Sequence, residues 1–293
     1  MPRLLGWGWP RTRSPLGALP QVMGIAALLL GGGLGWNLTP IATATVSSGS
    51  YPAPLSGQPR LSEQSIIFRD IPRQVSGVAR STVVRLMSSD RAGSGTLVGR
   101  SGRDYWVLTN WHVVAEGRFM TVLAPDGQRY RVLSRQRLGE NDLALVGFRA
   151  STSYPLAILS EERVQVGDPV FAVGYAMYDR RTYEPTLNQG LRPFRLLSGW
   201  VSLILPKPMP EGYQLGYTSP VEVGMSGGPV LDRWGAVVGV NGRSMGREAD
   251  FGVYTFADGT DPDPELLITM ERSSWGIPIT RRLIAIFSLS LER

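Results

Sequence analysis

The stretch that decides the fold is Gly224-Met225-Ser226-Gly227-Gly228-Pro229-Val230. A serine set among glycines, with a proline closing the run, predicts a tight turn that presents a hydroxyl group. Glycine permits close backbone approaches, so such a turn can aim neighbouring N–H groups at a developing oxyanion. A serine hydroxyl is a weak nucleophile without a general base, so this interpretation requires a histidine elsewhere in the chain.

The chain contains one histidine, His112, within the segment 108–114 that reads LTNWHVV. A catalytic imidazole also needs a carboxylate to orient it, and the best candidate is Asp142, in the segment 140–145 that reads ENDLAL. Asp126 lies in a turn sequence and Asp104 only eight residues before His112, so both are weaker candidates. The three residues predict a nucleophile, a general base and an orienting acid.

The serine motif alone is ambiguous because it also fits G-x-S-x-G, the nucleophile elbow of α/β-hydrolases. In those enzymes the histidine follows the serine, and here no histidine follows Ser226. The order His112, Asp142, Ser226 therefore argues against an esterase of the α/β-hydrolase class.

Together the three segments resemble the chymotrypsin-like (trypsin-like) serine proteases, which carry T-A-x-H-V, D-[IL]-A-[LV] and G-[DN]-S-G-G-P. The corresponding stretches are Thr109–Val113, Asp142–Leu145 and Gly224–Pro229. The resemblance covers roughly residues 76–290 and is closest to the bacterial, disulfide-free, HtrA-like branch. We expect no PDZ domain after it, although many HtrA relatives carry one.

The resemblance implies an all-β fold of two antiparallel six-stranded barrels with the active site in the cleft between them. It also implies that the Gly224 and Ser226 amides form the oxyanion hole, and that Pro220 occupies the floor of the specificity pocket. The substrate-binding segment is expected at Asn241, Gly242 and Arg243. We expect no charge at the pocket floor, and hence a preference for apolar substrate side chains.

Met225 stands where digestive trypsins have an aspartate that pairs with a new N-terminus after cleavage of the zymogen. Methionine cannot form that ion pair. We therefore expect the site to be ordered by packing, or by substrate or effector binding.

Strand patterns agree with a barrel architecture. Six short strand-like runs with turn residues between them occupy roughly residues 82–148, which favours a barrel over βαβ units. A hairpin is expected around Pro125-Asp126-Gly127. A second set of strand-like runs is expected at 156–159, 170–173, 194–205, 213–218, 230–231 and 236–240, with a further strand at 275–279. Thr280 is a good N-cap for a short C-terminal helix that runs through about Phe287.

Domain boundaries follow from composition. Residues 1–44 contain three arginines and no acid before an apolar run of about 13 residues and an A-x-A-like site at Ala42–Ala44, typical of a signal peptide. An uncleaved membrane anchor is the alternative. Residues 45–75 are predicted to be a Ser/Gly/Pro-rich linker, with a short helix around Ile66–Ala79. The protease domain is expected at 76–293, its first barrel at about 76–150 and its second at about 155–290.

Composition excludes several classes of function. The chain of 293 residues has no cysteine, which rules out disulfides and thiol chemistry. Its net charge of +6 is not gathered in a basic run with interleaved aromatics, so we expect no nucleic-acid partner. Acidic residues at 258–265 lie in an expected surface loop, but Pro262 and Pro264 break the spacing of an EF-hand. No metal or cofactor is predicted.

The sequence thus predicts an exported serine endopeptidase, periplasmic or in the cell envelope, that acts on polypeptides. The alternative is a catalytically weak or inactive protein with the same fold that serves as a binding or chaperone-like module. The oligomeric state is left open.

Overall fold

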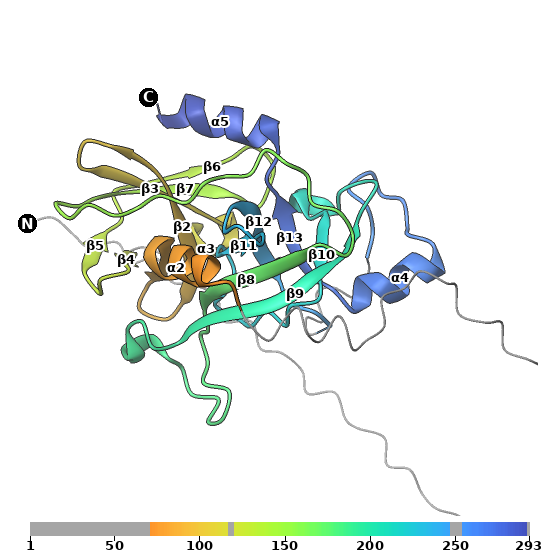
Figure 1. The fold of residues 1–293 in the computed structure, drawn as a ribbon, viewed down its shortest axis with the longest axis horizontal. Coiled ribbons are helices and arrows are strands. Elements are labelled where there is room, and N and C mark those ends of the chain that lie inside the picture. The colour runs from red at the N-terminus through yellow and green to blue at the C-terminus, as the bar shows by residue number, and fades with distance from the viewer. Residues whose placement is uncertain (1–70, 117–119, 247–253, 292–293) are drawn as a thin grey trace, which may run out of the picture. The chain divides into compact units, whose positions relative to one another are not determined.

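Two antiparallel β-sheets lie side by side in the computed structural model, which describes residues 71–116, 120–246 and 254–291 (Figure 1). Side chains are described as far as Phe287. The expected signal peptide or anchor at 1–44 and nearly all of the expected linker at 45–75 lie outside the described residues. None of the helices in the described ranges is long and apolar enough to cross a membrane.

The first sheet has seven strands in the order β5-β4-β1-β2-β3-β7-β6. They are β1 (Val83–Met87), β2 (Ala92–Ser101), β3 (Asp104–Thr109), β4 (Thr121–Leu123), β5 (Arg129–Arg131), β6 (Ser134–Arg137) and β7 (Ala144–Arg149). The expected hairpin is confirmed: β4 pairs with β5, and Gly127 in the turn has φ +84°. The sheet has one strand more than the expected six and remains open between β5 and β6. All four residues of β6 are exposed and polar, so the sequence has no alternation of apolar residues that would predict this strand.

The second sheet is a closed barrel of six strands in the order β10-β13-β12-β11-β8-β9. They are β8 (Pro169–Tyr175), β9 (Phe194–Ile204), β10 (Leu215–Tyr217), β11 (Pro229–Leu231), β12 (Val237–Arg243) and β13 (Ser274–Pro278). Closure pairs every strand on both sides and leaves no free edge. The expected strand at 156–159 is reduced to one bridge, between Leu159 and Val237. The all-β, chymotrypsin-like double-barrel fold class is confirmed.

Outside the sheets, the longer helices in the described ranges are α2 (Arg73–Thr82), α4 (Pro264–Glu271) and α5 (Arg281–Leu291). The expected C-terminal helix is confirmed as α5, and the Thr280 hydroxyl accepts a hydrogen bond from the Leu283 N–H at 3.2 Å. The interpretation of 258–265 as a loop throughout was wrong at its end, because α4 begins at Pro264. Proline is tolerated at the first helical position, and the Asp263 carboxylate caps that end by accepting from Leu266 N.

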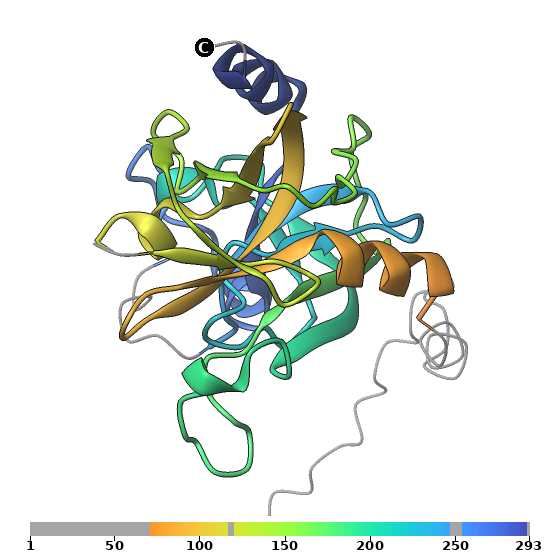
Figure 2. The ribbon, with the colours of Figure 1, turned by 90° about the vertical axis from the view of Figure 1, so that its left-hand side faces the viewer.

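One buried cluster joins the two sheets. It contains Leu108 and Leu145 from the first sheet together with Val173 and Val240 from the barrel. Burial of apolar side chains from both sheets in one core fixes their relative placement. The segment between β8 and β9, residues 176–193, projects away from that core (Figures 1 and 2).

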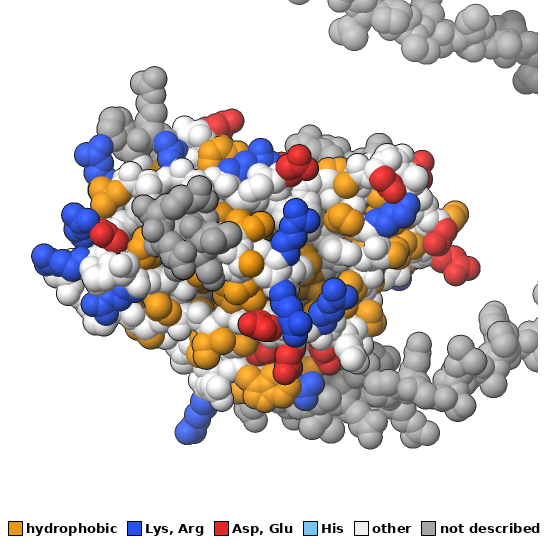
Figure 3. All heavy atoms as spheres, turned by 90° about the horizontal axis from the view of Figure 1, so that it is seen from above, with side chains coloured by type: hydrophobic (Ala, Val, Ile, Leu, Met, Phe, Trp, Pro, Cys, Tyr) orange, Lys and Arg blue, Asp and Glu red, His pale blue; other side chains and the backbone are white. Residues whose placement is uncertain are grey.

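The surface carries mixed charge. On the face shown in Figure 3, basic side chains are scattered and several lie next to acidic ones. Ion pairs of the described residues include Arg243 with Glu211 and Lys207 with Asp258. Interspersed charges of this kind give a surface without one dominant sign.

Candidate active site

The pairing of β3 with β7 brings His112 and Asp142 together. Thr109, the last residue of β3, lies opposite Ala144, the first residue of β7. His112 follows β3 and Asp142 precedes β7, so both lie at the same end of the sheet although 30 residues separate them in sequence. His112 lies on the short helix α3 (Trp111–Val114).

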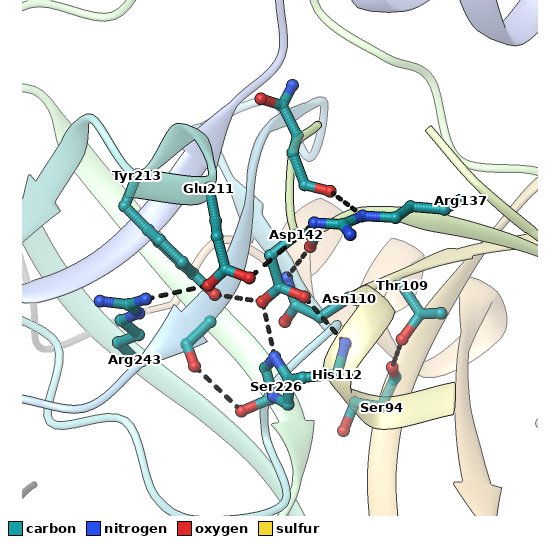
Figure 4. A network of polar contacts seen from close by, with 12 residues as sticks. Ser94, Thr109, Asn110, His112, Arg137, Asp142, Glu211, Tyr213, Ser226 and Arg243 are labelled. Carbon is teal, nitrogen blue, oxygen red and sulfur yellow. Dashed lines mark hydrogen bonds and ion pairs between the residues drawn. The ribbon is translucent and has the colours of Figure 1, made fainter. Parts of the chain in front are cut away.

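The Asp142 carboxylate binds His112 through two atoms. Oδ2 lies 2.5 Å from His112 Nδ1, and Oδ1 accepts a hydrogen bond from the His112 backbone N–H at 2.8 Å (Figure 4). The first amides of a helix have no partner within the helix, so this carboxylate also satisfies one of the open donors of α3. Asp142 is 1% exposed, whereas half of the His112 side chain is open to solvent.

The backbone of Asp142 is held as well. Its carbonyl accepts from Asn110 Nδ2 at 2.8 Å, and its N–H donates to the Glu211 carbonyl at 2.9 Å. A third donor reaches the carboxylate from the barrel, the Tyr213 hydroxyl at 2.5 Å from Oδ2. Burial raises the pKa of Asp142, but the hydrogen bonds from His112 and Tyr213 outweigh it, so the pKa lies below its ordinary value. The carboxylate is therefore ionised at neutral pH.

Ser226 lies on the turn between β10 and β11, and glycines shape that turn. Gly224 has φ +94° and Gly227 φ +85°, values that favour glycine over other residues. A Cβ on Gly227 would lie 2.1 Å from Thr109 Oγ1, closer than atoms can approach. Glycine is thus required here for the barrel turn to approach the end of β3.

Ser94 on β2 connects the first sheet to this turn. Its N–H donates to the Ser226 carbonyl at 2.8 Å, and its hydroxyl donates to the Gly224 carbonyl at 2.8 Å. The same hydroxyl accepts from Tyr175 N at 2.8 Å. Nothing in the local sequence marked Ser94, because its partners lie far away along the chain.

Met225 is fully buried in the barrel core with Val221 and Val230. Its N–H donates to the Glu222 carbonyl and its carbonyl accepts from Gly228, both at 3.0 Å. Met225 thus packs into the core at the position where trypsins carry the aspartate.

The Ser226 hydroxyl donates to the Gly242 carbonyl at 3.2 Å (Figure 4). Within the described ranges no hydrogen bond joins it to the His112 ring, yet Ser226, His112 and Asp142 line one cleft of about 430 Å³. Gly224 lines the same cleft. Neither the Gly224 nor the Ser226 backbone N–H donates a hydrogen bond to any other described residue.

A larger cavity of about 660 Å³ adjoins this cleft, and the two share Val221, Glu222, Val223 and Ser244. Pro220 lines the larger cavity. Glu222 is one-fifth exposed, and its Oε1 lies 2.6 Å from Arg180 Nη2. Arg195 Nε lies 3.4 Å from the same oxygen.

Arg85 of β1 forms hydrogen bonds with the segment between β8 and β9, which carries Arg180. Its buried guanidinium donates to the carbonyls of Thr186 and Gly190, and also to the Thr186 hydroxyl. Burial lowers the pKa of Arg85.

The three residues expected along the substrate have different environments. Gly242 and Arg243 line the cleft that contains Ser226. Arg243 contacts Glu211 at 3.1 Å and lies over the Tyr213 ring at 4.3 Å. Asn241 was placed wrongly, because it is fully buried and its side chain binds Val173 O, Pro229 O and the Tyr217 hydroxyl. Its backbone N–H and carbonyl pair with Gly228 and Gly227. Asn241 therefore has a structural role in the barrel.

The sequence analysis did not identify Asn110, which bonds the Asp142 carbonyl, or Tyr213, which bonds the Asp142 carboxylate. Asn110 lies two residues before His112, so its position in the histidine segment was a usable signal. Tyr213 lies 71 residues from Asp142, and no local sequence pattern predicts contact between them. Among the described residues no group of three or more His, Cys, Asp or Glu side chains could hold a metal ion.

An open sheet and a closed barrel that meet at a serine, a histidine and an aspartate define a trypsin-like fold and site. The chain belongs to the trypsin-like peptidase domain family, whose model matches residues 93–240. It is similar to the serine protease Do-like HtrA of Lactococcus lactis subsp. lactis, with 27% identity over 60% of this chain and 42% of the relative. It is also similar to the human serine protease HTRA4, with 25% identity over 51% of this chain and 30% of the relative.

The chain thus spans less than half the length of these curated relatives. A likeness of fold extends to the crystal structure of the serine endoprotease from Yersinia pestis, with a TM-score of 0.52 and 20% identity. That likeness covers 75% of this chain and 65% of the other. The sequence-based recognition of a trypsin-like peptidase domain is confirmed, and the similarity to HtrA proteases agrees with the branch that the sequence resembles.

Proposed function

We propose that this protein is an exported serine endopeptidase that hydrolyses peptide bonds through His112, Asp142 and Ser226. One observation carries the proposal: the first sheet supplies a buried carboxylate bound to an imidazole, and the barrel supplies a serine in the same cleft. Nucleophile, base and orienting acid in one cleft form the constellation that acyl transfer requires.

In the proposed reaction the Ser226 hydroxyl turns from the Gly242 carbonyl toward His112. The serine oxygen attacks the peptide carbonyl while His112 Nε2 takes the hydroxyl proton. The imidazolium then gives that proton to the leaving amine, and the acyl group remains on Ser226. His112 then takes a proton from a water molecule, whose oxygen attacks the acyl carbonyl. The bond to Ser226 breaks, the carboxylic acid product leaves, and the imidazolium gives the water-derived proton to the Ser226 oxygen.

Asp142 keeps the imidazole in the tautomer with hydrogen on Nδ1 and stabilises the imidazolium that forms. The N–H groups of Gly224 and Ser226 serve as oxyanion donors, which is supported by their lack of any partner among the described residues. One such donor is typically worth about 2.7–4 kcal/mol in the transition state.

The substrate side chain on the amino side of the scissile bond is proposed to enter the larger cavity. Pro220, Val221 and Val223 give that cavity an apolar wall. Burial of apolar area stabilises by about 25 cal/mol per Å², which favours substrates with small or medium apolar side chains.

Export rests on the composition of residues 1–44. Intact-mass analysis of protein from the cell envelope tests it: a mature start near Thr45 supports cleavage, whereas a start at Met1 with membrane retention supports the anchor.

Activity is tested with a fluorophosphonate that labels activated serines, and with a peptide library read by mass spectrometry. We expect labelling of the wild type and none of Ser226→Ala. Loss of most turnover is expected in His112→Ala, Asp142→Ala and Ser226→Ala, and these losses are expected to be strongly non-additive because the residues act as one unit.

The controls separate the alternatives. A folded wild type that binds peptides but is neither labelled nor active would support the binding module and overturn the proposal. Turnover of ester substrates alone would do the same in favour of an esterase.

A further inference from the structure

A buried tyrosine from the barrel reaches the catalytic carboxylate. Tyr213 is fully buried just before β10, and its hydroxyl donates to Asp142 Oδ2 at 2.5 Å. Oδ2 is the oxygen that also faces His112 Nδ1. The carboxylate therefore receives a donor from each of the two sheets, and Figure 4 shows Tyr213 and His112 approaching it from different directions.

This approach depends on the absence of a side chain at position 242. A Cβ on Gly242 would lie 2.3 Å from both the hydroxyl oxygen and Cε1 of Tyr213, far inside the range of real contacts. The backbone of Gly242 also accepts the Ser226 hydroxyl at 3.2 Å. The same glycine thus contacts the serine and leaves room for the tyrosine.

The surroundings hold the ring and keep its hydroxyl protonated. The Arg243 guanidinium lies over the ring at 4.3 Å and contacts Glu211 at 3.1 Å. Burial and the adjacent Asp142 carboxylate raise the pKa of Tyr213 well above its ordinary value. A phenol that keeps its proton is a constant donor to the carboxylate, whatever the protonation state of the imidazole.

We propose that Tyr213 is a positioning residue of the catalytic site, which fixes the Asp142 carboxylate from the barrel side. Position 242 must then be glycine, because any side chain there would displace the Tyr213 hydroxyl. The inference rests on the proposed function. A hydrogen bond to a carboxylate is roughly twice as strong as a neutral one, and here it restricts the rotation of the group that orients the base. It also makes the orientation of His112 depend on contact between the two sheets.

The decisive variant is Tyr213→Phe, which keeps the ring and removes the hydroxyl. We expect kcat to fall about 10- to 100-fold with KM nearly unchanged, because Asp142 orients the imidazole and does not touch substrate. The rate of fluorophosphonate labelling should fall by a similar factor.

The pH profile gives a readout that a merely structural role would not change. With one donor fewer, the carboxylate attracts the imidazolium proton more strongly, so the acidic limb of kcat/KM should move to higher pH. The other ionisable groups near the carboxylate are Glu211, Arg137 and Arg243, and Tyr213→Phe leaves all three residues in place and keeps the ring beneath Arg243.

The matched control is Tyr105→Phe, in the first sheet. Tyr105 is also fully buried, and its hydroxyl donates to the Thr152 carbonyl at 3.3 Å, away from the cleft. We expect its kcat and acidic limb to equal those of the wild type. Gly242→Ala provides a second, independent probe, because its methyl group would displace the Tyr213 hydroxyl and should produce the same shift of the limb.

The outcomes separate the two proposals. If the wild type is labelled at Ser226 but both Tyr213→Phe and Gly242→Ala keep the wild-type kcat and limb, the positioning role is wrong and the protease proposal stands. Equal shifts in Tyr105→Phe would also overturn it, since a general loss of packing would then be the cause. If the wild type itself is neither labelled nor active, the protease proposal fails first.

Discussion

The two halves of the candidate site differ in how firmly the structure holds their reactive groups. In the half from the first sheet, the Asp142 carboxylate accepts three hydrogen bonds, and its backbone N–H and carbonyl are both paired. In the half from the barrel, the Ser226 hydroxyl makes one hydrogen bond, to Gly242. The turn beneath it is nevertheless fixed by Ser94 and by the buried side chain of Met225.

This difference indicates where the reaction needs movement. In the proposed reaction, the imidazole of His112 and its carboxylate are already oriented, so substrate binding has little to arrange there. The serine needs only a side-chain rotation, because its backbone is held by contacts that cross from the first sheet to the barrel. Catalytic hydrogen bonds are often long or misaligned before substrate binds, so the resting position of Ser226 is compatible with activity.

The largest expected effect comes from Asp142→Asn, which replaces the carboxylate in the firmly held half of the site. The carboxylate faces three donors: the His112 backbone N–H, His112 Nδ1 and the Tyr213 hydroxyl. In the variant, the amide nitrogen would itself be a donor facing one of these groups. Where it faces Nδ1, it favours the imidazole tautomer without hydrogen on Nδ1. We expect kcat to fall about 10⁴-fold, as is typical when a triad carboxylate becomes an amide. Steady-state kinetics on a peptide substrate measures it.

Asp126→Asn is the matched control, since Asp126 lies in the exposed β4–β5 turn and accepts from Gln128 N and the Tyr154 hydroxyl. Its kcat should equal that of the wild type. A normal rate in Asp142→Asn together with a large loss in Asp126→Asn would show that the orienting carboxylate has been misassigned.

A smaller effect is expected from Ser94→Ala, which loosens the turn under the nucleophile. It leaves the Gly224 carbonyl without its donor and the buried Tyr175 N–H without its acceptor, at a cost of about 1–3 kcal/mol in the free energy of unfolding. We expect kcat to fall roughly tenfold as the oxyanion donors shift. Urea unfolding and steady-state kinetics measure the two effects.

Ser219→Ala controls for the loss of a buried hydroxyl, because the Ser219 hydroxyl has no hydrogen-bond partner in the part of the chain that the structure describes. Neither its stability nor its kcat should change. A Ser94→Ala protein that is destabilised but keeps its full kcat would mean that the barrel orders the turn without help from the first sheet.

The sequence was sufficient for the parts of the site that repeat a family pattern. The segments around His112, Asp142 and Ser226 predicted which residues would meet, and glycine spacing predicted the turn. The strands with apolar or β-branched runs were also found, because burial on one or both faces leaves a readable pattern.

The remaining features depend on contacts that leave no local trace. Strand β6 is polar along its whole length, so only its pairing with β7 defines it. Tyr213 and Ser94 act on residues 71 and 130 positions away. Asn241 was assigned to substrate because of its neighbours, whereas its side chain points into the barrel and satisfies two carbonyls there.

The smallest expected effect concerns the pocket and a second carboxylate, Glu222. It lies four residues before Ser226, and a free carboxylate there would attract a basic substrate side chain. The structure pairs it with Arg180 and Arg195, so its charge is already compensated. The other carboxylate that lines the larger cavity, Asp179, accepts hydrogen bonds from the backbone N–H groups of Arg181 and Thr182.

We therefore expect Glu222→Gln to change kcat/KM for substrates with an apolar residue before the scissile bond by less than about threefold, since an ion pair with the half-exposed Arg180 contributes little. Arg180→Gln sharpens the test: removal of the nearer cation should leave Glu222 undercompensated and increase cleavage after Arg or Lys. A peptide library profiled by mass spectrometry reads both variants. If the wild type already cleaves mainly after Arg or Lys, and Glu222→Gln suppresses that cleavage, then Glu222 faces the substrate and the arginines do not neutralise it. If the arginines do neutralise Glu222, a basic substrate side chain would be buried against Val221 and Val223 without a partner for its charge. The free-energy cost of burying that charge exceeds the gain from burying its apolar stem, and we therefore expect an apolar preference.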